Sequence, residues 1–160
     1  MSRPRTSSAV AVAAALVLAG CGGGDDGDPR TFARQADHVC AGLATAVGDL
    51  RDGLVRTDAA SEGAGLSSAL TRYATSTRRF ADELARTRPP RNERAFRDDA
   101  VSGLRRHARA MRRAAEQVRD GREASALRDE LRGGALPAVP ATLLADAPAC
   151  RRATSNSNSP

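Results

Sequence analysis

The spacing of apolar residues after position 30 is typical of helices. Apolar side chains recur every three or four positions, which places them on one face of an α-helix, and no segment alternates with period two over a useful length. The pattern predicts helices over residues 31 to 56, 66 to 88 and 92 to 120. The expected buried stripes are Phe32, Ala36, Val39, Leu43, Val47, Leu50 and Leu54; Leu66, Leu70, Tyr73, Thr77, Phe80 and Leu84; and Phe96, Ala100, Leu104, Ala108, Met111, Ala115 and Val118.

The predicted helix ends carry local signals. Thr31 and Asn92 are the expected N-caps of the first and third helices, because their side-chain oxygens accept hydrogen bonds from free backbone N–H groups. Pro89-Pro90 ends the second helix, since the residue before a proline avoids the helical region, and Gly121 ends the third. Residues 57 to 65 are expected to form a loop.

Glycines and prolines shape the rest of the pattern. Inside the first helix, three glycines each destabilise by about 1 kcal/mol relative to alanine, and we expect them to allow a neighbouring helix to approach closely. A weaker fourth helix over residues 123 to 132 is broken by Gly133-Gly134 and two prolines, and a short turn then carries Leu143 and Leu144 to the last cysteine. The three glycines are Gly42, Gly48 and Gly53.

Three long amphipathic helices and one broken helix, joined by short connections, predict an all-α fold. The expected architecture is an up-down antiparallel bundle of about four helices. Residues 31–150 form the bundle domain, and the polar residues 151–160 are expected to be a disordered tail. Alanine occupies many of the core positions, so the core should be thin.

The first 20 residues have the three parts of an export signal. Arg3 and Arg5 form a basic head, an uncharged apolar run follows, and small residues precede Cys21. The apolar run has about 12 residues, whereas crossing a bilayer takes about 20. Residues 1–20 are therefore expected to be a signal peptide, not a membrane span, and the glycine- and aspartate-rich residues 21–30 a flexible tether.

The segment Leu18-Ala19-Gly20-Cys21 resembles the lipobox of bacterial lipoproteins. This resemblance implies a diacylglycerol thioether on Cys21 and cleavage directly before it. Acyl chains would then hold the protein at the outer, extracytoplasmic face of the cell membrane, because two or more chains give stable anchoring. The alternative is an ordinary export signal whose cleavage point lies beside a cysteine.

Lipidation of Cys21 would leave Cys40 and Cys150 as an even pair. Disulfides persist in the exported compartment, and an up-down bundle returns its last segment to the start of the first helix. We therefore expect a Cys40–Cys150 disulfide, which would stabilise the fold by about 4–5 kcal/mol in the chain-entropy model. The alternative is two unrelated buried thiols.

Three short motifs extend the resemblance to most of residues 31 to 150. They are ADHVC in the first helix, RPP before the third and APAC at the end. Together they resemble short helical lipoproteins of high-GC Gram-positive bacteria. The resemblance implies the helical fold and the cysteine pair, but it implies no activity.

The charge is basic, with a formal net value of +6 that falls to +4 once residues 1–20 are removed, and all 25 basic residues are arginines. Five arginines gather on the side of the third helix away from its apolar stripe. On an exported protein we expect such a surface to meet anionic lipids or wall polymers, with no nucleic acid partner. The alternative is a solvated face paired with acids of a neighbouring helix. The five are Arg105, Arg106, Arg109, Arg112 and Arg113.

The sequence offers no catalytic constellation, cofactor motif or metal-ligand spacing. His38 and His107 are the only histidines, neither lies near a G-x-S-x-G motif, and both are expected to be structural. The predicted function is a non-enzymatic, membrane-anchored binding or scaffolding module with an unknown protein partner. The alternative is a small-molecule-binding accessory lipoprotein for uptake or sensing, which would need a cavity of about 300 Å³ or more with convergent polar groups.

Overall fold

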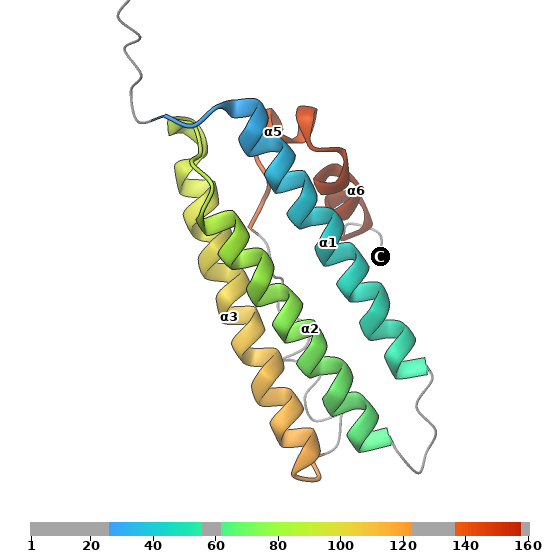
Figure 1. Ribbon diagram of the computed structural model, residues 1–160. Helices are drawn as coiled ribbons and strands as arrows, with labels where there is room; N and C mark the ends of the chain where they lie inside the picture. The colour runs from blue at the N-terminus through green and yellow to red at the C-terminus, as the bar shows by residue number, and fades with distance from the viewer. Residues whose placement is uncertain (1–25, 56–61, 123–136, 158–160) are drawn as a thin grey trace, which may run out of the picture.

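The computed structural model describes residues 26–55, 62–122 and 137–157, and within these ranges the chain is helical with no strand (Figure 1). The all-α prediction is confirmed. The expected fourth helix falls within residues 123–136, outside the described residues. The elements are α1 (Pro29–Val55), α2 (Glu62–Ala85), the 3₁₀ turn η1 (Arg91–Glu93), α3 (Arg94–Arg119), α5 (Ala141–Asp146) and α6 (Pro148–Ser157).

In Figure 1 the three long helices run down, up and down, so that α2 is antiparallel to both of the others. Helix α2 lies in the middle, with α3 along one flank and α1 along the other, and the short helices α5 and α6 lie against the first half of α1 (Figure 1). This order follows from the short connection between α2 and α3, which forces adjacent antiparallel packing.

The predicted apolar stripes form the core. One cluster joins α1, α2, α3, α5 and α6 around Phe32, Phe80 and Leu104, and a second joins α2 and α3 around Leu70 and Met111, with Ala46 of α1 as a further member. All predicted core positions with described side chains are buried except Val47 and Leu50, which are half-buried at the edge of the second cluster.

A disulfide joins the two ends of the folded chain. The Sγ atoms of Cys40 in α1 and Cys150 in α6 are 2.05 Å apart, and the two cysteines are separated by 110 residues in sequence. The backbone N–H of Ala149 also donates to the Asp37 carboxylate on α1. The predicted cysteine pairing is confirmed, and it holds the last segment against the first helix.

The N-caps differ from the predictions. Helix α1 begins at Pro29, and the carboxylate of Asp28 accepts the backbone N–H of Thr31 at 2.7 Å, so Asp28 caps the helix in place of Thr31. Hydrogen bonds from the Thr31 side chain and backbone lower the pKa of Asp28. Proline suits the first helical position because its missing N–H would be unbonded there in any case.

The start of α3 is a second correction. Asn92 lies in η1 and is no N-cap; Glu93 precedes α3 and makes no side-chain capping bond. Glu93 is buried and accepts the hydroxyl of Thr142, which links the start of α3 to α5. The Glu93 carboxylate therefore makes a tertiary hydrogen bond and does not cap α3. Gly121 follows the end of α3 with φ +92°, as expected for a glycine after a helix.

Three segments expected to be irregular are more ordered. Helix α2 begins at Glu62, inside the expected loop 57–65. At the N-terminal side, the tether prediction is wrong for residues 26–30, because the Asp26 carboxylate pairs with Arg91 at 2.9 Å and Arg94 at 2.8 Å, and α1 already begins at Pro29.

The tail prediction is wrong for residues 151–157. The disulfide fixes α6 at its third residue, and the helix then continues to Ser157. The backbone N–H of Arg151 donates to the Ala147 carbonyl at 3.1 Å, and its guanidinium donates to the Leu144 carbonyl at 3.2 Å. These bonds extend the helix beyond the predicted domain end at residue 150.

Two of the three glycines in α1 lie at close helix contacts. A Cβ on Gly42 would clash with Cζ of the buried Phe80 ring, and one on Gly53 would lie 3.1 Å from the Ala69 Cβ. A Cβ on Gly48 would meet nothing within 4 Å. The expectation of close approach is therefore confirmed at Gly42 and Gly53 and wrong at Gly48.

Replacing these glycines should have opposite effects. Gly42→Ala should lower the free energy of unfolding by about 1–3 kcal/mol, because the methyl group overpacks against Phe80. Gly48→Ala should raise it by about 0.5–1 kcal/mol, because only helix propensity changes there. Urea unfolding of the two variants measures both effects. Equal stability of the two variants would contradict the contact at Phe80.

Candidate functional site

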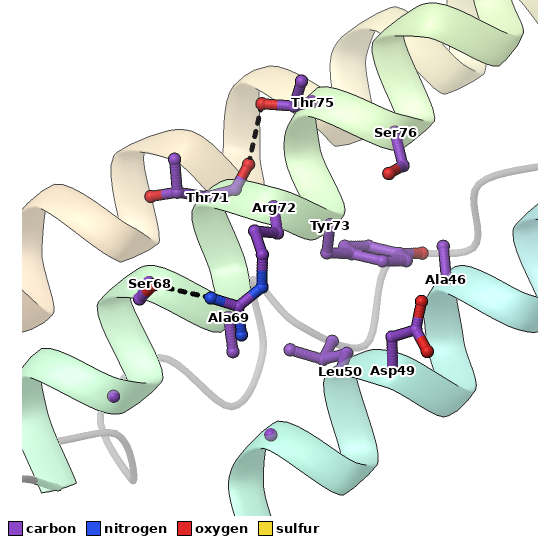
Figure 2. A pocket seen from close by; sticks show the side chains of 12 residues that line it. Ala46, Asp49, Leu50, Ser68, Ala69, Thr71, Arg72, Tyr73, Thr75 and Ser76 are labelled. Atoms are coloured by element: carbon purple, nitrogen blue, oxygen red, sulfur yellow. Dashed lines mark hydrogen bonds between the residues drawn. The ribbon is translucent and has the colours of Figure 1, made fainter.

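A groove of about 790 Å³ lies between α1 and α2, in the half of the bundle away from the disulfide (Figure 2). Small residues line much of it, so little side-chain volume fills the space beside the contact between the two helices. The lining residues are Ala46, Asp49, Leu50 and Gly53 of α1 and Gly65, Ser68, Ala69, Thr71, Arg72, Tyr73, Thr75 and Ser76 of α2.

The polar groups of the groove come from both helices. The Arg72 guanidinium donates to the Ser68 hydroxyl at 2.7 Å, and Asp49 lies on the facing turns of α1 (Figure 2). The hydroxyls of Thr71 and Thr75 donate to carbonyls of their own helix at 2.8 and 2.9 Å, so their protons are already used. Among the described residues, the ionic groups that line the groove are one arginine and one carboxylate.

Tyr73 forms part of the groove wall and connects it to α3. Its hydroxyl lies 3.2 Å from Nε2 of His107, and the two rings meet edge to face with centroids 5.6 Å apart. Burial raises the pKa of the Tyr73 phenol and lowers the pKa of His107. Both shifts favour the uncharged forms. The pair is a neutral hydrogen bond across the core, and His107 has the half-buried position expected for a structural histidine.

The other histidine lies in a different environment. The His38 side chain is 64% exposed, and its Nε2 is 3.5 Å from a carboxylate oxygen of Glu83 on α2. Its ring edge also contacts Phe80. The two histidines therefore lie at separate helix contacts, His38 at α1–α2 and His107 at α2–α3.

The five predicted arginines do not act as one group. Arg105 donates to Asp82 of α2 at 2.8 Å, which is the neighbouring-helix pairing foreseen as the alternative. Arg106 donates to Ser102 on its own helix at 2.6 Å. The other three, Arg109, Arg112 and Arg113, are exposed and form no ion pair or side-chain hydrogen bond within the described part of the chain.

Sequence reasoning missed Arg78 and Asp82 of α2 as members of this charged surface. With Arg105, Ala108, Arg109 and Arg112, they line a second hollow, of about 160 Å³. Arg78 and Asp82 are spaced four residues apart and are 3.9 Å from each other. That spacing indicates a pair on one helix face, but nothing in it indicates which helix lies opposite.

Neither a metal centre nor a membrane span is found in the described ranges. No group of three or more His, Cys, Asp or Glu side chains there is placed to hold a metal ion. None of the helices there combines the length and apolar character needed to cross a bilayer. Cys21 and the predicted signal peptide lie outside the described residues, so lipidation stays a prediction.

The lowered pKa of His107 predicts a pH dependence of stability. The unfolded chain binds a proton near the ordinary value of 6.5, whereas the folded chain binds it only at lower pH. The free energy of unfolding should therefore be fully retained above about pH 6.5 and fall as the pH is lowered toward 5. Denaturant unfolding between pH 5 and 7.5 measures this slope.

The matched variants are His107→Gln, which keeps a polar side chain without titrating, and His38→Gln. His107→Gln should flatten the slope between pH 5 and 6.5, and His38→Gln should retain the part that arises from His107. A slope unchanged by His107→Gln would show that burial of this imidazole does not set the pH response.

Comparisons with known proteins identify no relative of this chain. No family model matches it, no curated protein is detectably similar to it, and no solved structure matches its fold.

Proposed function

We propose that the protein is an exported lipoprotein whose helical bundle acts as a non-enzymatic binding or scaffolding module at the outer face of the cell membrane. The observation that carries this proposal is the segment Leu18-Ala19-Gly20-Cys21, which follows an uncharged apolar run and precedes the folded domain. Acylation of Cys21 would anchor the domain through its own N-terminus.

The beginning of the folded domain supports this topology. Asp26 is held by Arg91 and Arg94, and the backbone N–H of Gly27 donates to the Pro89 carbonyl at 3.2 Å. Only four residues separate Cys21 from Asp26. At about 3.4 Å per residue, they span at most about 17 Å. The end of the bundle that carries η1 and α5 would then face the membrane at short range.

The disulfide also supports an exported location. Disulfides form and persist in oxidising compartments and are rare in the cytosol. The Cys40–Cys150 bond closes most of the domain into one loop. A thin, alanine-rich core contributes little stability, so the disulfide matters most in such a fold. The stability of the fold therefore depends on a compartment in which the disulfide persists.

Membrane fractionation of Cys21→Ala tests the proposal. The wild-type chain should appear in the membrane fraction with the mass of a cleaved, acylated protein. Cys21→Ala should lose the acyl mass and either leave the membrane or remain unprocessed, because no thiol is available for the thioether. Cys40→Ala/Cys150→Ala is the control, since it removes two cysteines but should keep the anchor. Normal processing and retention of Cys21→Ala would overturn the proposal.

The α1–α2 groove favours a second candidate function, binding of a small molecule. Its volume of about 790 Å³ lies within the range of about 300–1,000 Å³ typical of ligand sites. Apolar surface from Ala46, Leu50 and the Tyr73 ring lies beside the ionic groups of Asp49 and Arg72 (Figure 2). The ligand chemistry that fits is a small molecule with an apolar body and charges of both signs.

A thermal-shift screen of small zwitterionic compounds tests this candidate. At least one compound should raise the Tm of the wild type by several degrees, because a ligand at 100 times its Kd stabilises by about 2.7 kcal/mol. Asp49→Ala/Arg72→Ala should abolish the shift, since both ionic groups are lost. The control Asp99→Ala/Arg119→Ala changes two exposed charges outside the groove and should keep it. A screen with no shift, or with equal shifts in all three proteins, would rule the groove out.

A further inference from the structure

The hollow between α2 and α3 concentrates positive charge from two helices. It is lined by four arginines, one aspartate and one alanine, with Arg78 and Asp82 from α2 and the others from α3. Four guanidinium groups against one carboxylate leave an excess of three positive charges. We call this site the arginine hollow; its members are Arg78, Asp82, Arg105, Ala108, Arg109 and Arg112.

Helix geometry explains which arginines of α3 reach the hollow. Arg105, Arg109 and Arg112 are spaced by four and then three residues, so they share one helix face. Arg106 and Arg113 fall on a neighbouring face and do not line the hollow. The sequence cluster of five is thus divided into three arginines that converge with Arg78 and two that do not.

Asp82 neutralises only part of this charge. Its carboxylate accepts a hydrogen bond from Arg105 at 2.8 Å and lies 3.9 Å from Arg78. That bond from Arg105, the largest cause, lowers the pKa of Asp82 and keeps the carboxylate ionised. Arg109 and Arg112 have no such partner in the described ranges, so their donors are available to an incoming anion.

The size of the hollow favours a compact anion. Ala108 is the only apolar residue among the described residues that line the hollow, and it is small, so it leaves an open space of about 160 Å³. A phosphoryl group is compact and has several oxygens, and planar guanidinium groups bind such oxygens with paired N–H donors.

We propose that the arginine hollow binds a phosphate group. The oxygens would accept hydrogen bonds from Arg109 and Arg112, with Arg78 and Arg105 supplying further positive charge from opposite sides. This site is separate from the α1–α2 groove and does not depend on the lipid anchor. The phosphate could belong to a free anion or to a phospholipid headgroup, and both sources present the same chemistry.

Titration calorimetry with inorganic phosphate on the full chain tests the proposal, with sodium chloride at matched ionic strength as the blank. The wild type should bind phosphate. Arg109→Gln/Arg112→Gln should weaken binding by at least about tenfold, because two charge-assisted hydrogen bonds are lost. The matched control is Arg106→Gln/Arg113→Gln, which removes the same charge from the same helix and should change the affinity by less than about twofold.

Two results would overturn the proposal. One is wild-type protein that shows no binding beyond the chloride blank. The other is an equal loss in both double variants, which would mean that only the overall charge of α3 attracts the anion. Circular dichroism melting of each variant verifies that the helices remain folded, and Gln is chosen because it keeps helix propensity.

Flotation with vesicles then distinguishes the two sources of phosphate. Vesicles of phosphatidylglycerol and of phosphatidylcholine are compared for the wild type and the two double variants. Selective loss of phosphatidylglycerol binding in Arg109→Gln/Arg112→Gln would support a lipid headgroup as the ligand. Vesicle binding that is the same in all three proteins, together with the selective loss of inorganic phosphate binding, would support a free phosphate.

Discussion

The covalent bond between Cys40 and Cys150 is the constraint on which the closed form of this domain depends. Helices α5 and α6 have only 6 and 10 residues, and isolated helices of that length are not stable in water. Their buried side chains are few, chiefly Leu143 of α5 and Ala149 and Cys150 of α6. The disulfide removes loop-closure entropy from the unfolded chain, and it thereby supports a cluster in which all five α-helices of the described ranges take part.

The two candidate binding surfaces arise from what the packing leaves open. In the half of the bundle with the disulfide, α5 and α6 cover α1, and the core is closed. In the other half, small residues at Ala46, Gly53 and Ala69 bring α1 and α2 together without filling the space beside them. The outward arginines of α3 lie around Asp82 of α2, and this single carboxylate does not neutralise their positive charge. Both surfaces thus follow from an alanine- and arginine-rich composition placed on long helices.

The helix ends show where local signals are overridden. Thr31 and Asn92 are good capping residues, yet Asp28 caps α1 and Glu93 precedes α3. In each case a contact decides the outcome. Asp28 is followed by a proline that favours the first helical position. Glu93 is buried and accepts a hydrogen bond from the Thr142 hydroxyl. The salt bridges of Asp26 likewise turn an expected tether into part of the folded unit.

The sequence by itself determined the three long helices, their buried faces and the cysteine pair. A period of 3.6 residues specifies which side of each helix is apolar, and the bundle topology follows from short connections. Only the tertiary structure decided which polar faces meet. The contact of Tyr73 with His107 and the gathering of Arg78 with the arginines of α3 join residues 27 or more positions apart. Helical periodicity describes one helix at a time, so it carries no information about the rotation and offset of one helix against the next. That rotation and offset determine both the Tyr73–His107 contact and the arginine hollow.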